Sequence, residues 1–209
     1  MPANLSLSLR PITPEDEPFL ARLYASTREQ ELAQTNWSDE QKAMFCRMQF
    51  NAQTADYQRN YPDASFDIIE RDGVAAGRLL VRLADDAIHV IDIALLPEHR
   101  GTGIGTKFLK ELQDEAKAAA KKLSIHVEQF NPARRLYERL GFQQVEEKGV
   151  YLLLHWSSKE TGKRKPETGK WVRSFHRRVG MPIVECRLAS VRENGMERLH
   201  RISSDGGQT

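Results

Sequence analysis

Ile88-His89-Val90-Ile91-Asp92-Ile93-Ala94-Leu95-Leu96 is an apolar run that leads directly into Pro97-Glu98-His99-Arg100-Gly101-Thr102-Gly103-Ile104-Gly105. The run predicts a buried strand, and the residues after the glycines predict a long helix. The glycines let the backbone take positive φ and approach a ligand closely. The first N–H groups of a helix have no partner within it, so together they form a site for an anion. The stretch therefore predicts a strand, a phosphate-binding turn and a helix as one continuous unit.

Before this unit, the sequence predicts two helices. Leu5, Leu7 and Leu9 alternate with polar residues, which indicates a short strand, and Thr13-Pro14 suits the start of the first helix. The second helix is expected over about Asp39 to Asn60. It carries a Met and aromatic stripe that we interpret as packing rather than as a cofactor site, namely Met44, Phe45, Met48 and Tyr57.

A hairpin is predicted between those helices and the glycine-rich turn. Residues 66–70 and 74–83 flank Arg71-Asp72-Gly73, where the Asp-Gly pair favours a tight turn. Asp85-Asp86 then separates the second of these strands from the run that begins at Ile88. Two consecutive hairpin connections predict an antiparallel sheet that leads into the turn.

The residues after the turn continue with alternating helices and strands. An apolar stripe marks the first helix, with Ile104, Phe108, Leu112, Ala116 and Ala119 on one side. Residues 123–127 return as a strand, and Asn131-Pro132 suits a second helix start, with Asn131 as the cap. Gly141 predicts a left-handed stop for that helix, and residues 142–146 and 150–156 predict two closing strands.

Electrostatic character differs between two parts of the chain, although the formal net charge of all 209 residues is only +2. Residues 157–209 hold 12 Lys and Arg against 6 Asp and Glu, whereas residues 1–156 hold 19 against 23. The segment 157–170 has almost no apolar residues, which is typical of a solvated linker. We therefore expect one domain over residues 1–156 and a basic extension over residues 157–209 that is flexible or docks on something.

Composition narrows the class of protein. An apolar content of 40% is enough for an ordinary globular core, and no apolar stretch approaches the roughly 18 residues that a membrane-spanning helix needs. The N-terminal residues lack a basic segment followed by an apolar one, so no secretory signal is expected. Cys46 and Cys186 match no metal-ligand spacing and are interpreted as buried or bystander thiols of a cytoplasmic protein that binds no metal.

Two motifs in a fixed order point to a fold family. Arg100-x-x-Gly103-x-Gly105 follows the strand, and Asn131-Pro132-Ala133-x-x-Leu136-Tyr137-x-x-x-Gly141-Phe142 follows about thirty residues later. This order resembles the GNAT superfamily of N-acetyltransferases over about residues 5–156. A Rossmann dinucleotide fold is the competitor, but it needs an acidic residue about twenty positions after the glycines. Residues 120–125 read Ala-Lys-Lys-Leu-Ser-Ile and contain no acid, so the Rossmann interpretation fails.

The resemblance implies an α/β (α+β) fold with a mixed, mostly antiparallel twisted sheet flanked by helices. A splayed strand pair would form the cleft for acetyl-coenzyme A, the implied cosubstrate. The residues implied to bind it are Ile93, Ala94, Leu95, Arg100, Gly101, Thr102, Gly103, Ile104, Gly105, Thr106 and Asn131. The amides of residues 101–106 would hold the diphosphate, and the backbone of residues 93–95 would pair with the pantetheine arm and polarise the thioester carbonyl. Arg100 either contacts the diphosphate or is solvated, and Asn131 either contacts the coenzyme or only caps a helix.

For catalysis, the resemblance implies that Tyr137 is the general acid near the coenzyme sulfur, although a packing role for this ring stays open. The general base is not settled by the sequence. His89 has a suitable ordinary pKa, whereas Asp92 needs burial or an intervening water molecule. Strand alternation places His89 and Asp92 on opposite faces unless a bulge intervenes. Glu128, beside the expected cleft, is a third candidate.

The expected activity is acetyl transfer from acetyl-coenzyme A to a primary amine, either on a small molecule or on a protein. Two alternatives stay open: a fold that binds acetyl-coenzyme A without turnover, and a basic tail that binds nucleic acid or a partner. No membrane partner is expected, and a homodimer is one option for the oligomeric state. The acceptor is not identified by the sequence. Four aromatic residues are candidates to line its site or to pack in the core, namely Trp37, Phe45, Tyr57 and Tyr151.

Overall fold

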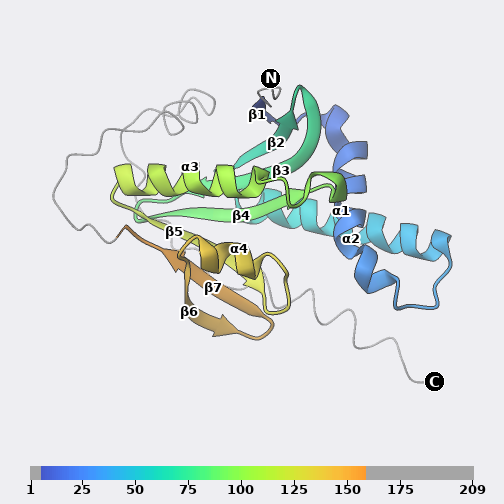
Figure 1. Ribbon diagram of the computed structural model, residues 1–209. Helices are drawn as coiled ribbons and strands as arrows, with labels where there is room; N and C mark the ends of the chain where they lie inside the picture. The colour runs from blue at the N-terminus through green and yellow to red at the C-terminus, as the bar shows by residue number, and fades with distance from the viewer. Residues whose placement is uncertain (1–5, 159–209) are drawn as a thin grey trace.

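A seven-stranded sheet with the strand order β1-β2-β3-β4-β5-β7-β6 forms the centre of the molecule (Figure 1). The computed structural model describes residues 6–158. The helices and strands are β1 (Leu7–Pro11), η1 (Pro14–Asp16), α1 (Glu17–Leu32), α2 (Asp39–Asn60), β2 (Ser65–Arg71), β3 (Val74–Leu83), β4 (Ala87–Leu95), η2 (Pro97–His99), α3 (Ile104–Ala118), β5 (Lys122–Glu128), α4 (Arg134–Arg139), β6 (Gln143–Lys148) and β7 (Tyr151–Trp156).

The strand directions confirm the predicted mostly antiparallel sheet. All neighbouring strands run antiparallel except β4 and β5, which are parallel. A parallel pair needs a crossover between its strands, and helix α3 is that crossover. The predicted hairpin between β2 and β3 is confirmed as well. Asp72 (φ 54°) and Gly73 (φ 78°) form its turn, with the two positive φ values that a tight hairpin of this kind requires.

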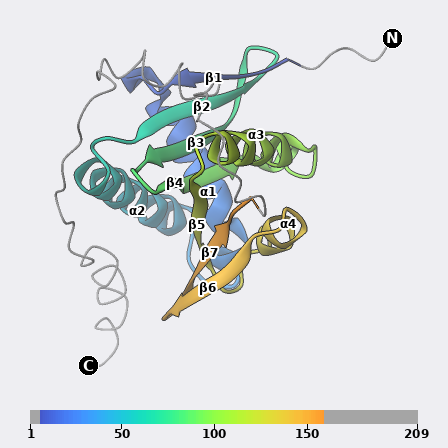
Figure 2. The same ribbon diagram turned by 90° about the vertical axis from the view of Figure 1, so that its left-hand side faces the viewer.

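Helices cover both faces of the sheet. Figure 2 shows α3 and α4 on one side and α1 and α2 on the other. On the α3 side, the buried apolar residues of β2 to β5 and β7 pack against Phe108, Leu109 and Leu112. On the other side, a smaller cluster joins Leu20 and Tyr24 of α1 to Phe50 of α2. The sheet is therefore the middle layer of three.

Helix α2 has the predicted bounds but presents a different side to the sheet. Met44 and Met48, interpreted above as packing residues, are 70% and 54% exposed, so that interpretation is wrong for both methionines. The buried residues are Cys46 and Phe50, which lie one turn apart. The sequence offers two stripes on this helix, and the one that contacts α1 and the sheet is offset by two residues from the one that carries the methionines.

Helix α4 is shorter than the sequence suggests. It begins at Arg134, not at Pro132, and Asn131 accepts a hydrogen bond from the Ala133 N–H at 2.9 Å. Asn131 thus closes a turn ahead of the helix instead of capping it, a common use of an Asn side chain. Gly141 has φ 84° and ends the helix as predicted.

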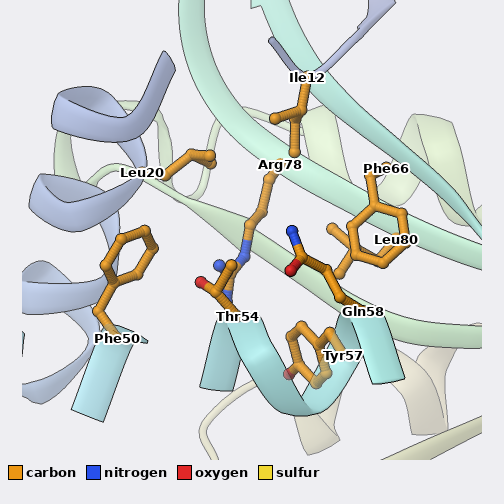
Figure 3. Close-up of a pocket in the computed structure, with 9 residues that line it drawn as sticks. All are labelled: Ile12, Leu20, Phe50, Thr54, Tyr57, Gln58, Phe66, Arg78 and Leu80. Atoms are coloured by element: carbon orange, nitrogen blue, oxygen red, sulfur yellow. The ribbon is translucent and has the colours of Figure 1, made fainter. Parts of the chain in front are cut away.

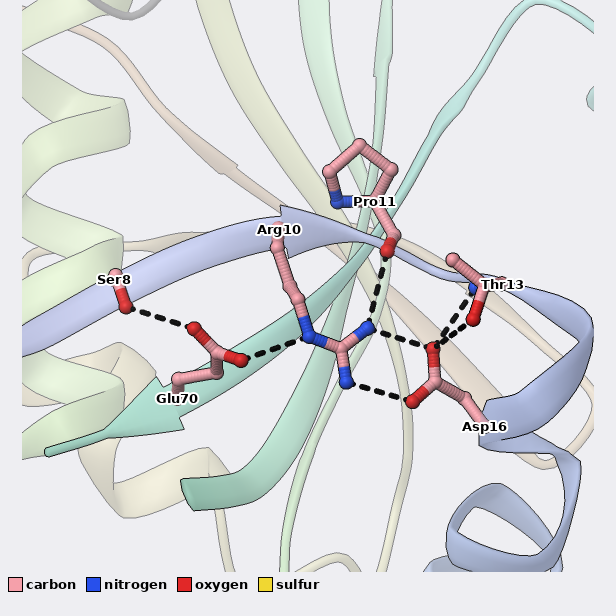
Figure 4. Close-up of polar contacts among 6 residues, drawn as sticks. All are labelled: Ser8, Arg10, Pro11, Thr13, Asp16 and Glu70. Carbon is pink, nitrogen blue, oxygen red and sulfur yellow. Dashed lines mark hydrogen bonds and ion pairs between the residues drawn. The ribbon is translucent and has the colours of Figure 1, made fainter. Parts of the chain in front are cut away.

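Arg10 ties the first strand to the start of the helical layer (Figure 4). Its guanidinium donates to both carboxylate oxygens of Asp16 at 2.7 Å and to Glu70 on β2 at 2.8 Å. Asp16 also accepts from the N–H of Thr13. These hydrogen bonds, first among them that from Arg10, lower the pKa of Asp16 from 3.8 to about 2.

The predicted basic extension lies almost wholly outside the described residues, as does Cys186, and β7 ends at Trp156. Cys46 is buried and has no disulfide partner among residues 6–158. No helix in that part of the chain is long and apolar enough to cross a membrane.

Candidate functional site

The turn between β4 and α3 has the backbone that its glycines predict. Gly101 and Gly103 have φ values of 73° and 88°, which disfavour residues with a Cβ. An added Cβ would meet no atom within 4 Å at either position, so conformation and not space requires glycine there. The backbone N–H of Lys107 donates to the Gly103 carbonyl at 2.9 Å and is the first intrahelical donor of α3. The amides of Ile104, Gly105 and Thr106 precede it and are oriented to bind an anion.

Arg100 is exposed, and its side chain makes contacts that the sequence analysis did not include. Its Nε donates to the Leu95 carbonyl at 2.9 Å, and its Nη2 donates to Ser26 on α1, to the carbonyl at 3.2 Å and to the hydroxyl at 3.0 Å. The side chain therefore joins the end of β4 to helix α1. Ser26 lies 74 residues from Arg100 in sequence, and no local pattern marks it as a partner.

Strands β4 and β5 separate beside this turn. They pair only over Ala87–Val90 and Lys122–Ile125. Strand β4 continues to Leu95 along β3, and β5 continues to Glu128 along β7. The edge of β4 that faces β5 is thus open at Ile93, Ala94 and Leu95, within the part of the chain that is described. The residues implied to pair with the pantetheine arm lie on this open edge.

A glycine on the neighbouring strand lets β3 approach that segment. Gly77 lies opposite Leu95, and a Cβ at Gly77 would collide with the Ala94 carbonyl oxygen and the Leu95 side chain. Any larger residue would displace β4 where it borders the opening. The shape of the opening therefore depends on β3 as well as on β4 and β5.

Tyr137 of α4 is buried, with 4% of its surface exposed, in the core on the α3 side. Its ring contacts Phe142 edge-on, with 5.8 Å between centroids. Burial first, and then the negative charge of Asp92, raise the pKa of the Tyr137 phenol well above its usual value. The phenol is protonated at neutral pH and is able to donate a proton.

Asp92 is held by a buried arginine that the sequence analysis did not single out. Arg78 of β3 donates from Nε to the Asp92 carboxylate and from Nη2 to Gln53 of α2 at 2.7 Å. Its guanidinium carbon lies 5.8 Å from the centroid of the Tyr57 ring. The signal for Arg78 is its place in the apolar strand Val74–Leu83, because a buried cation needs an anionic partner. Asp92 on the next strand is that partner.

A bulge in β4 brings His89 and Asp92 to one face. Leu80 pairs with Asp92 and Val81 with Val90, so Ile91 is an extra residue. His89 pairs with Arg82, two residues from Leu80, and therefore faces the same side as Asp92. The sequence analysis named such a bulge as the exception to their lying on opposite faces.

His89 contacts the neighbouring strand β5. Its Nδ1 lies 2.5 Å from the Ser124 hydroxyl, and Ser124 pairs in turn with His155 of β7. Burial first, and then the charge of Arg82, lower the pKa of His89. His89 is consequently neutral at pH 7. His126 and His155 on the same face were missed by the sequence analysis, although the alternation of Ser124 and His126 in β5 marks that face as polar.

Glu128 and the four aromatic candidates lie in different parts of the fold. Glu128 ends β5 opposite Tyr151, whose pKa is raised by burial and then by Glu128. Trp37 and Phe45 contact each other edge-on, with 5.2 Å between centroids. Tyr57 contacts Arg78 as described above. No group of three or more His, Cys, Asp or Glu side chains within residues 6–158 has an arrangement that could hold a metal ion.

Comparison with known proteins gives a consistent result. The family described as Acetyltransferase (GNAT) matches residues 26–142. A Bacillus subtilis protein named as a candidate ribosomal protein bS18-alanine N-acetyltransferase is 33% identical over 84 residues, which are 39% of this chain and 56% of the relative. The chain thus matches little more than half the length of that curated relative.

Solved structures with a similar fold include two acetyltransferases. The PaiA N-acetyltransferase of Thermoplasma acidophilum, in complex with coenzyme A, has a TM-score of 0.56 at 18% identity, covering 73% of this chain and 99% of that one. An acetyltransferase from Thermus thermophilus has a TM-score of 0.53 at 21% identity, covering 73% and 97%. At this level of identity the likeness shows the fold.

Proposed function

Since the chain belongs to the acetyltransferase (GNAT) family, we propose that it is an N-acetyltransferase that acetylates a primary amine with acetyl-coenzyme A as the donor. The observation that carries the proposal is the opening between β4 and β5 beside the glycine turn that begins α3. The named activity of the Bacillus subtilis relative and the bound coenzyme A in the Thermoplasma structure support it.

The backbone around the opening fits coenzyme A. The amides of Ile104, Gly105 and Thr106 would hold the diphosphate at the N-terminal end of α3. The open edge of β4 at residues 93–95 would exchange hydrogen bonds with the amide groups of the pantetheine arm. When bound, the coenzyme supplies an acyl group activated as a thioester. Arg100 would act on the coenzyme indirectly, because its hydrogen bonds to Leu95 and Ser26 fix the turn.

Tyr137 is proposed as the general acid. The amine nitrogen attacks the thioester carbonyl carbon, the carbon–sulfur bond breaks, and the Tyr137 hydroxyl gives its proton to the departing sulfur. The raised pKa keeps this proton on the phenol at neutral pH, so the donor is present when the thiolate forms next to it. Solvent then returns a proton to the phenolate.

Asp92 is proposed to orient the amine and to receive its proton through water. Its carboxylate accepts a hydrogen bond from Arg78 and attracts an ammonium group. His89 is the second candidate for this step. It is neutral at pH 7 and faces the same side of the sheet, but its Nδ1 is engaged with Ser124.

A pair of glycine variants tests the coenzyme site. Gly103→Ala and Gly73→Ala both place a Cβ at positive φ in open space, so both are expected to cost about 1 kcal/mol of folding free energy. Only Gly103→Ala is expected to weaken coenzyme A binding, by at least tenfold in calorimetry. Equal affinities for the two variants would contradict the proposed diphosphate site.

Turnover is measured separately. Thiol release from acetyl-coenzyme A in the presence of an amine library, with mass-spectrometric detection of acetylated products, is expected to identify at least one acceptor. Folded protein that binds no coenzyme A would refute the proposal. Coenzyme binding without any acetylated product would replace it with the role of a binding protein without turnover.

A further inference from the structure

A cavity of about 220 Å3 lies between helix α2 and strands β2 and β3 (Figure 3). Its apolar walls are Ile12, Leu20 of α1, Phe50 of α2, Phe66 of β2 and Leu80 of β3. The cavity is open to solvent, and the exposed Gln58 lies at its rim. Its walls indicate an occupant that is largely apolar.

The cavity lies next to the Arg78–Asp92 ion pair. Arg78 and Tyr57 line the cavity, and Arg78 donates to Asp92 on the neighbouring strand β4. The guanidinium carbon of Arg78 lies 5.8 Å from the centroid of the Tyr57 ring, so both side chains of the cavity wall lie beside this ion pair. A molecule whose amine lies at Asp92 would therefore have its remaining part beside Tyr57 and the cavity.

Among residues 6–158, the one charged residue in the cavity wall is a cation, Arg78, which is 6% exposed. Thr54, Tyr57 and Gln58 are the neutral residues there that carry polar groups. In a buried site, a second positive charge beside a guanidinium is strongly unfavourable. An apolar or aromatic group has no such cost and gains by leaving water.

We infer that this cavity binds the apolar or aromatic part of the acceptor, so that the preferred substrate is a monoamine with an apolar body and not a polyamine. The inference rests on the proposed function, because it takes Asp92 as the group that orients the amine. The inference also limits how many positive charges a preferred acceptor carries. The net negative charge of residues 1–156 suits a cationic acceptor, but the cation in the cavity wall opposes a second ammonium group on the same molecule.

The test uses two tryptophan variants of α2. Gln58 is exposed and lines the cavity, so Gln58→Trp covers its mouth without a change in the core. Ala52 is exposed six positions earlier, about 120° around the helix from Gln58, so Ala52→Trp is the matched control. Calorimetry on the full chain, with and without saturating coenzyme A, compares 2-phenylethylamine with 1,4-diaminobutane. The coenzyme titration reports on the proposed function, and the amine titrations report on the cavity.

The wild-type chain is expected to bind 2-phenylethylamine at least tenfold more tightly than 1,4-diaminobutane. Gln58→Trp is expected to weaken 2-phenylethylamine binding at least tenfold, and Ala52→Trp to leave it unchanged. Equal or tighter binding of the diamine, absence of 2-phenylethylamine binding, or an unchanged affinity in Gln58→Trp would each overturn the inference. Because the amines are also titrated without coenzyme A, these outcomes are decided even if the coenzyme does not bind.

Discussion

The two faces of the sheet are built from different kinds of residues. Within residues 6–158, 17 buried residues form one apolar cluster on the α3 side, whereas 6 do so on the α1 and α2 side, beside a cavity and the Arg78–Asp92 ion pair. Apolar burial stabilises a fold, and a buried charge pair gives little or no net stability. The difference indicates that the α3 side holds the structure together, while the opposite side keeps costly polar groups that the proposed reaction would use.

Replacing one leucine by alanine on each face of the sheet tests this comparison, and it is expected to have the largest effect on the free energy of unfolding. Leu109→Ala on α3, fully buried, is expected to lower the free energy of unfolding by about 3 kcal/mol. Leu20→Ala, which already borders the cavity, loses fewer contacts and is expected to cost about half as much. Urea unfolding of both variants provides the measurement. Equal losses would mean that the two sides are packed alike.

Tyr137 is the exception on the α3 side, because it is buried there and yet is proposed to act in catalysis. Tyr137→Phe is expected to lower kcat about 100-fold while the affinity for coenzyme A stays the same, since only the proton donor is lost. Tyr61→Phe, which removes a half-buried phenol on the other side of the sheet, is the control. An unchanged kcat in Tyr137→Phe would remove this residue from the mechanism and make the α3 side purely structural.

The Arg78–Asp92 pair tests whether the α1 and α2 side trades stability for chemistry. Arg78→Met leaves the Asp92 carboxylate without its partner and is expected to cost about 2 kcal/mol of stability. Arg78→Met with Asp92→Asn is expected to recover most of this loss and yet remain far less active than the wild type. Urea unfolding measures the stability of the single and the double variant, and steady-state kinetics measures their activity. A double variant with wild-type activity would show that the pair has no part in the reaction.

The smallest effect on stability is expected from Asp16→Asn, at the start of the helical layer that α1 and α2 form. The pKa of Asp16 is lower in the folded chain than its ordinary value of 3.8, so the ionised group favours folding. This stabilisation is complete above about pH 4 and is lost as the pH falls toward 2. Because Arg10 is 37% exposed, it amounts to about 1 kcal/mol. Thermal unfolding of Asp16→Asn and wild type should therefore differ at pH 6 and converge near pH 2; a constant difference would exclude this titration.

Local features of the fold were predictable from the sequence. The glycine-rich turn, the Asp72-Gly73 hairpin and the helix Asp39–Asn60 depend on φ preferences and periodicity within short segments. The open β4–β5 pair followed from the family resemblance, which carries information that no short segment contains. The exposed Met44 and Met48 show the limit of periodicity, because a helix with two weak stripes does not specify which one is buried.

The polar groups of the site were less predictable, because their partners lie far away in sequence. Arg100 reaches Ser26, and Arg78 reaches Gln53 as well as Asp92. A charged residue inside an apolar strand indicates that a partner exists, but the partner is identified only by the strand order and register. The bulge at Ile91 was also not predictable, because nothing in the run Ile88–Leu96 distinguishes an extra residue from a paired one.

That bulge fixes which residues of β4 face each side of the sheet. Upstream of Ile91, Ile88 and Val90 face the α3 side; downstream, Ile93 and Leu95 do so. Without the bulge, regular pairing of all these residues would turn Ile93 toward Arg78 and send the Asp92 carboxylate into hydrocarbon surroundings. In the evolution of this chain, single replacements along β4 can therefore accumulate one at a time, whereas a second inserted residue that shifted the pairing would exchange chemistry and packing at every later position of the strand.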